Sequence, residues 1–251
     1  MLLIGGAILV AAVAGLITLT RYVERAAGEL PDNRPELCGP PAPGKTRVVL
    51  LGDSLTLGRM SASYETLLRE RPEMQTFEFI NAGINSELAW NLLQRVDHIL
   101  SCNPQVVLVL VGCNDINALA TPAKTAEYMK EQKLPRSPAP DEFASHVLAL
   151  AERLKGRVSR VAFFSPSVLG EDLTTPENER ALQYAGIVRD AARRAGAAYL
   201  PLQERQRAIL SALPLSVRAR ETCAGGQNGV KMAAFRHFIL RQSWEQVARA
   251  N

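Results

Sequence analysis

The stretch Val48-Val49-Leu50-Leu51-Gly52-Asp53-Ser54-Leu55-Thr56-Leu57-Gly58 determines how this chain folds, because an apolar run breaks there into glycine and hydroxyl residues. Four consecutive apolar residues without polar alternation are typical of a strand covered on both faces, as in the centre of a parallel α/β sheet. Ligands of such sheets bind beyond the carboxyl ends of the strands. Ser54 follows the run and is therefore a candidate nucleophile, although Asp and Ser after a strand are also ordinary helix N-cap residues.

Strand-like runs recur along the chain, and amphipathic stretches lie between them. The runs cover residues 47–52, 77–81, 106–112, 161–165 and 198–201. Between them, apolar residues recur every three or four positions, as in the sets Leu88, Leu92, Val96, Ile99 and Phe143, Val147, Leu150, Leu154. This spacing is that of helices with one buried face. The alternation predicts a parallel sheet of five strands with helices between them.

The amino-terminal segment predicts a membrane anchor. Residues 2–20 carry no charge and, as a helix, would span close to the roughly 30 Å hydrocarbon layer of a bilayer. A cleaved signal peptide is the alternative, but it would normally carry positive charge before the apolar run. We expect an anchor over residues 1–20, a proline-rich spacer over 21–44 and a domain over 45–251. The arginines that follow the span favour a cytoplasmic domain by the positive-inside rule.

Composition narrows the classes of partner. The 251 residues are 47% hydrophobic, which is enough for one sizeable core and an appendage. The net charge is +4, and the arginines are scattered over predicted helix faces instead of forming a block. We therefore expect no nucleic-acid partner.

The four cysteines permit two disulfides or none. Cys102 and Cys113 flank one predicted strand, and at about 3.3 Å per residue they lie beyond the roughly 7 Å limit between bridged Cα atoms. Only pairings that involve Cys38 or Cys223 therefore remain plausible.

Two further predicted strands also end in glycine and short polar residues. The second ends in Asn81-Ala82-Gly83-Ile84-Asn85, and the third ends in Gly112-Cys113-Asn114-Asp115. In a parallel sheet these ends and Ser54 would meet in one crevice. Acyl transfer needs donors directed at the developing oxyanion, and a glycine N–H, an asparagine amide and the N–H of the serine can supply them.

A long excursion over residues 117–140 follows the third strand. It contains a possible short helix at 123–133 and then three prolines. Loops of this length at the carboxyl end of a strand commonly shape a substrate pocket, and a plain surface insertion is the alternative.

These motifs resemble those of the GDSL, or SGNH, hydrolase family over about residues 47–251. Gly52-Asp53-Ser54-Leu55 matches its first block, Gly83 its glycine block, and Gly112-Cys113-Asn114-Asp115 its asparagine block. The resemblance implies hydrolysis of a small-molecule or lipid ester, with lipid, aryl and carbohydrate esters all among the family's substrates. It also implies that Ser54 is the nucleophile and that the N–H groups of Ser54 and Gly83 and the side chain of Asn114 form the oxyanion hole. The resemblance further implies a three-layer α/β/α sandwich of SGNH, flavodoxin-like type around the five-stranded parallel sheet. It implies no metal and no cofactor.

The family's last block, Asp-x-x-His, supplies the base and the carboxylate that orients it. At that place this chain reads Asn228-Gly229-Val230-Lys231. A serine hydroxyl is a weak nucleophile at neutral pH without an adjacent base. Lys231 could be that base if burial lowers its pKa.

The altered block allows two further interpretations. One of the three histidines, His98, His146 or His237, could supply the base, and His146 is best placed because its predicted helix begins on the crevice side. Alternatively, the domain is a catalytically impaired binding module, in which a protonated lysine beside the oxyanion hole would favour an anionic or acylated ligand.

Overall fold

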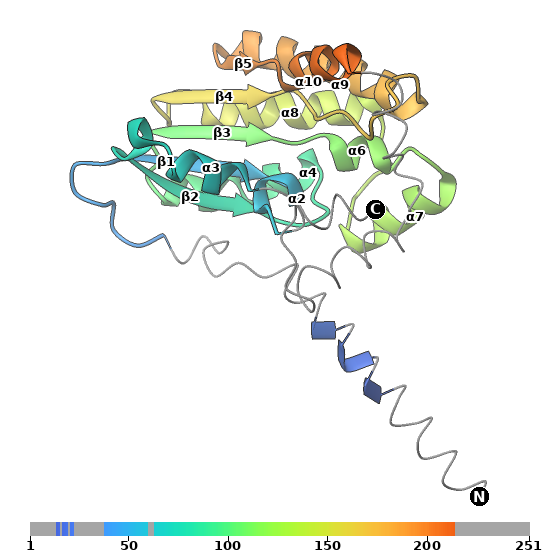
Figure 1. Ribbon diagram of the computed structural model, residues 1–251, viewed down its shortest axis with the longest axis horizontal. Helices are drawn as coiled ribbons and strands as arrows, with labels where there is room; N and C mark the ends of the chain where they lie inside the picture. Colours follow the sequence, from blue (N-terminus) through green and yellow to red (C-terminus); the bar gives the residue numbers. More distant parts are fainter. Residues whose placement is uncertain (1–13, 16, 20, 23–37, 60–62, 214–251) are drawn as a thin grey trace, which may run out of the picture. The chain divides into compact units, whose positions relative to one another are not determined.

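The computed structural model describes residues 14–15, 17–19, 21–22, 38–59 and 63–213 (Figure 1). The chain divides into two compact units, residues 1–29 with 224–251 and residues 30–223. Of the first unit, only positions between 14 and 22 are described, and these are helical. The second unit contains the sheet and the candidate site.

The predicted anchor lies mostly outside the described residues. In the part of the chain that the structure describes, no helix is long and apolar enough to cross a membrane. The anchor over residues 1–20 stays a prediction. Of the predicted spacer over residues 21–44, residues 21–22 and 38–44 are described. The first two are helical, and residues 38–44 form turns and irregular chain.

The predicted five-stranded parallel sheet is confirmed. Its strands run in the order β2-β1-β3-β4-β5, and every neighbouring pair is parallel. The strands are β1 (Thr46–Gly52), β2 (Phe77–Gly83), β3 (Val106–Leu110), β4 (Arg160–Phe164) and β5 (Ala198–Leu200). Each coincides with one of the five apolar runs of the sequence.

The described helices of the second unit lie between these strands or, in the case of α10, after the last one. They are α2 (Ser54–Leu57), α3 (Tyr64–Arg69), α4 (Ala89–Gln94), α5 (Val96–Ser101), α6 (Cys113–Asn117), α7 (Pro122–Glu131), α8 (Pro140–Leu154), α9 (Pro176–Ala195) and α10 (Leu202–Ala212). A 3₁₀ turn, η3 (Pro72–Met74), precedes β2. The helix expected within the long excursion is α7.

Alternate side chains of the central strands enter two hydrophobic cores. Val49, Leu51, Val107 and Val109 pack on the face covered by α4, α5, α8 and α9. On the other face, which carries α3 in Figure 1, Val48, Leu50 and Phe79 form a smaller cluster. Helices thus lie on both faces of a doubly wound sheet.

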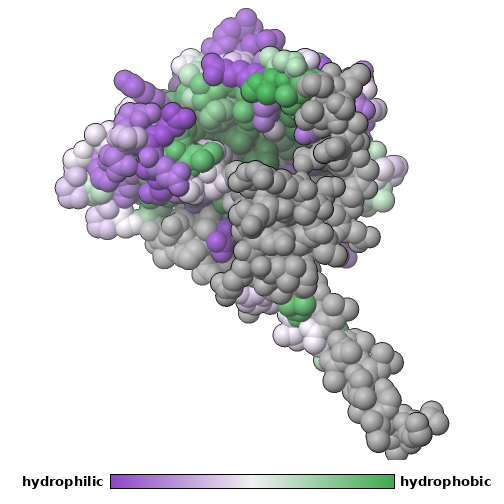
Figure 2. Space-filling model, in the orientation of Figure 1, coloured by the Kyte–Doolittle hydropathy of each residue, from purple (hydrophilic) through white to green (hydrophobic). Residues whose placement is uncertain are grey.

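The face that carries α3 is not fully covered by described residues. Val106, Leu108 and Phe164 are only half-buried there. Figure 2 shows hydrophobic surface between hydrophilic areas on this side of the domain.

The two longest helices follow signals in the sequence. α8 has proline in its first turn and buries Phe143, Val147, Leu150 and Leu154, the set whose spacing predicted it. The Thr175 side chain caps α9 by accepting from the Asn178 N–H, and Gly196 ends this helix at φ 71°. That left-handed conformation is easily accessible only to glycine.

A buried arginine holds the amino edge of the sheet together. Arg47 is 2% exposed, and its Nε lies 2.9 Å from Oε2 of Glu78. The same guanidinium donates to the carbonyls of Cys102, at 2.8 Å, and Gly39, at 2.9 Å. A buried guanidinium needs such partners to offset its desolvation.

Cys38 and Cys102 form a disulfide at this edge, with their Cα atoms 5.4 Å apart. This is one of the pairings that the spacing of the cysteines left open. Cys113 is free and buried, and Cys223 lies outside the described residues. The bond ties the segment before β1 to the end of α5.

We expect replacement of both bridged cysteines by alanine to lower the free energy of unfolding by about 2–4 kcal/mol, because the bond closes a long loop in the unfolded chain. The two residues are 64 positions apart. Urea unfolding of the parent and the Cys38→Ala, Cys102→Ala variant measures the difference. Reductant should destabilise the parent and leave the variant unchanged, and equal stability of the two oxidised proteins would contradict the pairing.

Candidate active site

Strand register brings the three predicted polar strand ends to one edge of the sheet. Gly52, the last residue of β1, pairs with Gly83 of β2 and with Leu110 of β3. The strand order reverses direction at β1, and ligands of such sheets bind at the crevice beside this switch point. The segments that follow β1 and β3, α2 and α6, both begin at this edge of the sheet (Figure 1).

Ser54 is the first residue of α2 and is half-buried. Asp53 caps this four-residue helix, and its Oδ1 accepts from the Leu55 N–H at 2.9 Å. Gly58 ends the helix at φ 69°. Within the described part of the chain, no side chain hydrogen-bonds to the Ser54 hydroxyl.

Gly83 is packed closely against α2, and the donor role expected for its N–H stays a prediction. Its N–H donates to Oδ1 of Asn81 at 3.0 Å and is therefore already engaged. A Cβ atom at Gly83 would collide with the backbone of Thr56 and Leu57. The missing side chain thus lets α2 cross directly over the end of β2.

Ser86 is a residue that sequence reasoning missed. It lies in the loop after β2, is half-buried and has φ 63°, which is uncommon for a residue other than glycine. Such strained backbone clusters at functional sites. Among the described residues, no acceptor pairs with its N–H, which makes it a further candidate oxyanion donor. The polar run Asn85-Ser86-Glu87 directly after a strand was the available signal.

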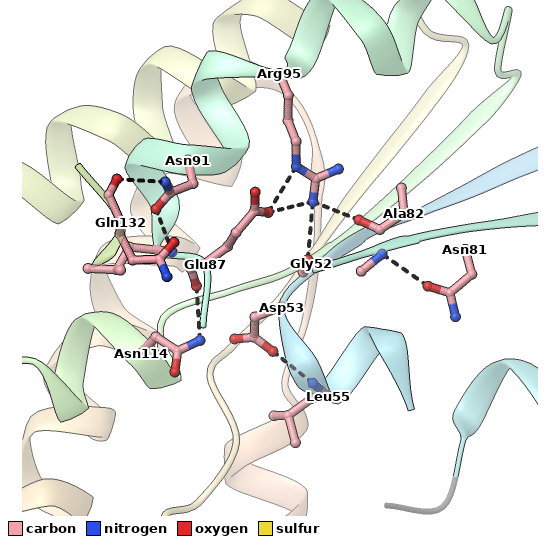
Figure 3. A network of polar contacts seen from close by, with 12 residues as sticks. Gly52, Asp53, Leu55, Asn81, Ala82, Glu87, Asn91, Arg95, Asn114 and Gln132 are labelled. Atoms are coloured by element: carbon pink, nitrogen blue, oxygen red, sulfur yellow. Dashed lines mark hydrogen bonds and ion pairs between the residues drawn. The ribbon is translucent and has the colours of Figure 1, made fainter. Parts of the chain in front are cut away.

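Asn114 lies in α6, directly beyond the carboxyl end of β3, and is 8% exposed. Its Nδ2 donates to the Glu87 carbonyl at 3.0 Å, and its Oδ1 accepts from the Tyr128 hydroxyl at 2.9 Å. Figure 3 shows the bond to Glu87. One Nδ2 hydrogen remains for a ligand, because an amide nitrogen carries two donors.

Arg95 joins the ends of two strands to the loop that contacts Asn114. Its guanidinium donates to the carbonyls of Ala82, at 2.7 Å, and Gly52, at 3.3 Å, and pairs with Glu87 at 2.7 Å (Figure 3). The spacing predicted one helix over residues 88–99, but the chain turns at Arg95 between α4 and α5. Burial raises the pKa of Glu87, although the Arg95 charge opposes this shift.

Two buried carboxyl groups lie behind the crevice. Burial, with a smaller contribution from Glu87, raises the pKa of Asp53 to about 7. The pKa of Asp115 is raised to about 7 mainly by burial, and both of its oxygens lie 3.3 Å from the Ala89 N–H at the start of α4. Oδ2 of Asp53 has no hydrogen-bond partner among the described residues.

The predicted residues of the last block, Asn228 and Lys231, and also His237, lie outside the described residues. His98 is exposed on α5, close to the amino end of β3 and thus away from the crevice. His146 packs on Trp90 with ring centroids 5.3 Å apart, and burial lowers its pKa.

A pocket beside the crevice includes His146. Its lining comes from α4, α6, the loop before α8 and α8 itself, and includes Leu88, Trp90, Asp115, Phe143 and His146. Ser54 is not among the residues that line it. Among the described residues, no group of His, Cys, Asp and Glu side chains is arranged to hold a metal ion.

The sequence model of the GDSL-like lipase/acylhydrolase family matches residues 50–220 of this chain. The chain belongs to this family. The matched part includes Ser54, Gly83 and Asn114 and ends before Asn228. No curated protein sequence matches the chain significantly.

Solved structures of an acetylxylan esterase and of an α/β hydrolase share the fold. Axe2, an acetylxylan esterase from Geobacillus stearothermophilus, superposes with a TM-score of 0.56 at 18% identity, covering 81% of this chain and 98% of its own. A catalytic mutant of Axe2 gives a TM-score of 0.57 at 19% identity, covering 80% and 97%. LAE5, an α/β hydrolase from the metagenome of Lake Arreo, Spain, gives 0.56 at 19%, covering 75% and 94%.

Gly83→Ala should lower the free energy of unfolding by about 2–3 kcal/mol, because the added methyl group overpacks the contact with α2. Gly186→Ala is the matched control. Gly186 lies within α9, where a Cβ atom meets only the end of Arg189 at 3.9 Å. That change should raise stability by about 0.5–1 kcal/mol through helix propensity. Equal effects of the two changes in urea unfolding would show that Gly83 is not packed as described.

Asp115→Asn should make the stability of the protein less dependent on pH. The pKa of Asp115 is raised on folding, so its contribution is fully present below about pH 4 and is lost as the pH rises through about 7. Each such group can give a slope of up to about 1.4 kcal/mol per pH unit in this window. Urea unfolding between pH 5 and 8 measures the slope. Asp141→Asn is the control, because Asp141 is exposed. This change should leave the slope of stability against pH the same as in the parent.

Proposed function

We propose that the domain is a serine hydrolase that cleaves an ester through an acyl-enzyme on Ser54. The observation that carries this proposal is the placement of Ser54 and Asn114 beyond the carboxyl ends of the paired strands β1 and β3. The Asn114 amide is held from two sides and keeps one hydrogen for a developing oxyanion. The N–H groups of Ser54 and Ser86 are the further donors.

In the proposed reaction, Oγ of Ser54 attacks the ester carbonyl carbon and its proton passes to a base. The carbonyl oxygen becomes an oxyanion that accepts hydrogen bonds from Asn114 and the backbone donors, and such donors typically contribute about 3 kcal/mol each. The C–O bond then breaks, and the alcohol leaves with the proton from the base. Water attacks the acyl-enzyme by the same path and releases the acid.

Acetyl esters are the substrates with which to begin. Axe2, which shares the fold, is described as an acetylxylan esterase. Because the identity to Axe2 is low, the acyl group and the alcohol of the substrate are both part of the proposal. Lipid esters are also substrates of the proposed kind, since they contain the same ester bond. We therefore choose 4-nitrophenyl acetate as the probe, because its small acyl group and good leaving group require little recognition of the alcohol by the protein.

Lys231 is the base in this proposal. Catalytic mutants of Axe2 replace a serine, an aspartate or a histidine, the last two being three residues apart. In this chain, Asn228 and Lys231 have the same spacing. A lysine can accept a proton near neutral pH when an apolar environment lowers its pKa. His146 is the second candidate for the base, because it lies in the first half of α8.

A binding module is the alternative function. It is favoured by the absence of the Asp-x-x-His pair at residues 228–231. In that case a protonated Lys231 and the Asn114 amide would together hold the anionic part of a ligand. Such a protein would not turn over esters, and its Ser54 would not react with electrophiles.

We also propose that the domain faces an oxidising compartment while residues 1–20 hold it at the membrane. The pairing of Cys38 with Cys102 supports this side, because disulfides are rare in the cytosol. The arginines after residue 20 favour the opposite side. We give the disulfide more weight because it joins two segments that are also bound through Arg47.

A fluorophosphonate probe and 4-nitrophenyl acetate together test the proposed function. The parent should be labelled at neutral pH and should hydrolyse the ester, and Ser54→Ala should abolish both activities. Ser101→Ala is the matched control, because Ser101 is exposed on α5 at the opposite edge of the sheet. If the parent is neither labelled nor active, the hydrolase proposal is wrong and the binding module is the remaining function.

The same assay distinguishes the bases. Lys231→Met should abolish turnover if Lys231 accepts the Ser54 proton, whereas His146→Gln should leave it within about twofold. The reverse pattern would make His146 the base. Activity that survives both changes would contradict both assignments.

A further inference from the structure

The orientation of the Asn114 amide follows from its two partners. The Glu87 carbonyl can only accept, so the atom that faces it at 3.0 Å must be the Nδ2 donor. The other end, Oδ1, therefore faces the Tyr128 hydroxyl, which donates to it at 2.9 Å. With these bonds made, the amide plane is fixed and its second hydrogen points in one direction.

Tyr128 comes from α7, the helix within the long excursion after β3. Side-chain bonds attach this helix close to both of its ends. The Thr125 hydroxyl donates to the Ala118 carbonyl at 2.7 Å, and Nδ2 of Asn91 donates to the Gln132 carbonyl at 3.2 Å. The excursion is therefore bound to the residues around the crevice, and its tyrosine is presented from a fixed element.

We propose that Tyr128 is a positioning residue that orients the Asn114 amide so that its free hydrogen is directed at the oxyanion. The proposal rests on the proposed function, since it assigns a role within that reaction. Tyr128 itself does not touch the reacting atoms. It acts through Oδ1 of Asn114, on the side opposite to the Glu87 carbonyl.

Two physical effects would make an oriented Asn114 amide a stronger oxyanion donor. An oxyanion donor contributes most when its direction is fixed before the charge develops. Donation into the amide oxygen also polarises the amide, so the Nδ2 hydrogens become better donors. Burial raises the pKa of Tyr128 to about 12, so its hydroxyl stays protonated and able to donate at every pH used for assay.

Tyr128→Phe removes only the hydroxyl and tests the proposal. We expect kcat for 4-nitrophenyl acetate to fall about tenfold, as for loss of one hydrogen bond, with KM changed less than about twofold. Tyr199→Phe is the matched control. Tyr199 is also half-buried and donates its hydroxyl to a side chain, Glu204, at 2.6 Å, but it lies on β5. This control should leave kcat unchanged.

A double-mutant cycle with Asn114→Ala shows whether Tyr128 acts through the amide. Asn114→Ala alone should lower kcat on the order of a hundredfold. In that background Tyr128→Phe should change kcat by less than about twofold, because the group that it orients is absent. Full-length protein is used for all four members, and a thermal melt of each shows that it folds.

Three outcomes would overturn the proposal. If Tyr128→Phe lowers kcat equally in both backgrounds, the hydroxyl supports the fold and not the amide. If it leaves kcat as in the parent, the orientation of Asn114 does not depend on it, while the proposed function stands. If the parent is inactive and unlabelled at Ser54, the proposed function fails and the role of Tyr128 fails with it.

Discussion

The close passage of α2 over the ends of β1 and β2 is the constraint on which the site depends. Gly52 and Gly83 are paired in register, and a Cβ atom at either would collide with residues of α2. Without side chains there, β1 can run directly into a helix, and Ser54 stands immediately beyond the sheet. Gly52 and Gly83 thus matter because they lack a side chain and not because of a left-handed backbone. Of the glycines around α2, Gly58 has a positive φ, and Gly52 and Gly83 do not.

The fold could be predicted from the sequence because each strand of the parallel sheet is an apolar run between polar breaks. The placement of Ser54 and Asn114 at the carboxyl edge could be predicted for the same reason, since each directly follows such a run. Gly83 shows the limit of this reasoning. Its close packing against α2 and the hydrogen bond of its N–H to Asn81 depend on contacts that the sequence does not show.

Tyr128 and Arg95 could not be predicted, because their partners are distant in sequence or belong to the backbone. Arg95 reaches the Gly52 carbonyl 43 positions away, and nothing in a helical repeat distinguishes it from an exposed arginine. Tyr128 lies within an excursion whose spacing predicts a helix and not its docking. Ser86 left a weak signal in a polar run, but its left-handed backbone is a property of the folded loop.

Burial of the polar network at the carboxyl edge of the sheet costs desolvation free energy, so the network is not explained by stability alone. Replacing a buried ion pair such as Arg95–Glu87 by apolar side chains is often neutral or stabilising, so the pair is weak evidence of a stabilising role. Its effect is directional. Arg95 fixes the strand ends and the loop whose Glu87 carbonyl holds Asn114, while Asp115 receives the first N–H of α4. A network that fixes the direction of a side chain, even where it lowers stability, is what the proposed oxyanion donor Asn114 requires, because such a donor contributes most when it is oriented before the charge develops.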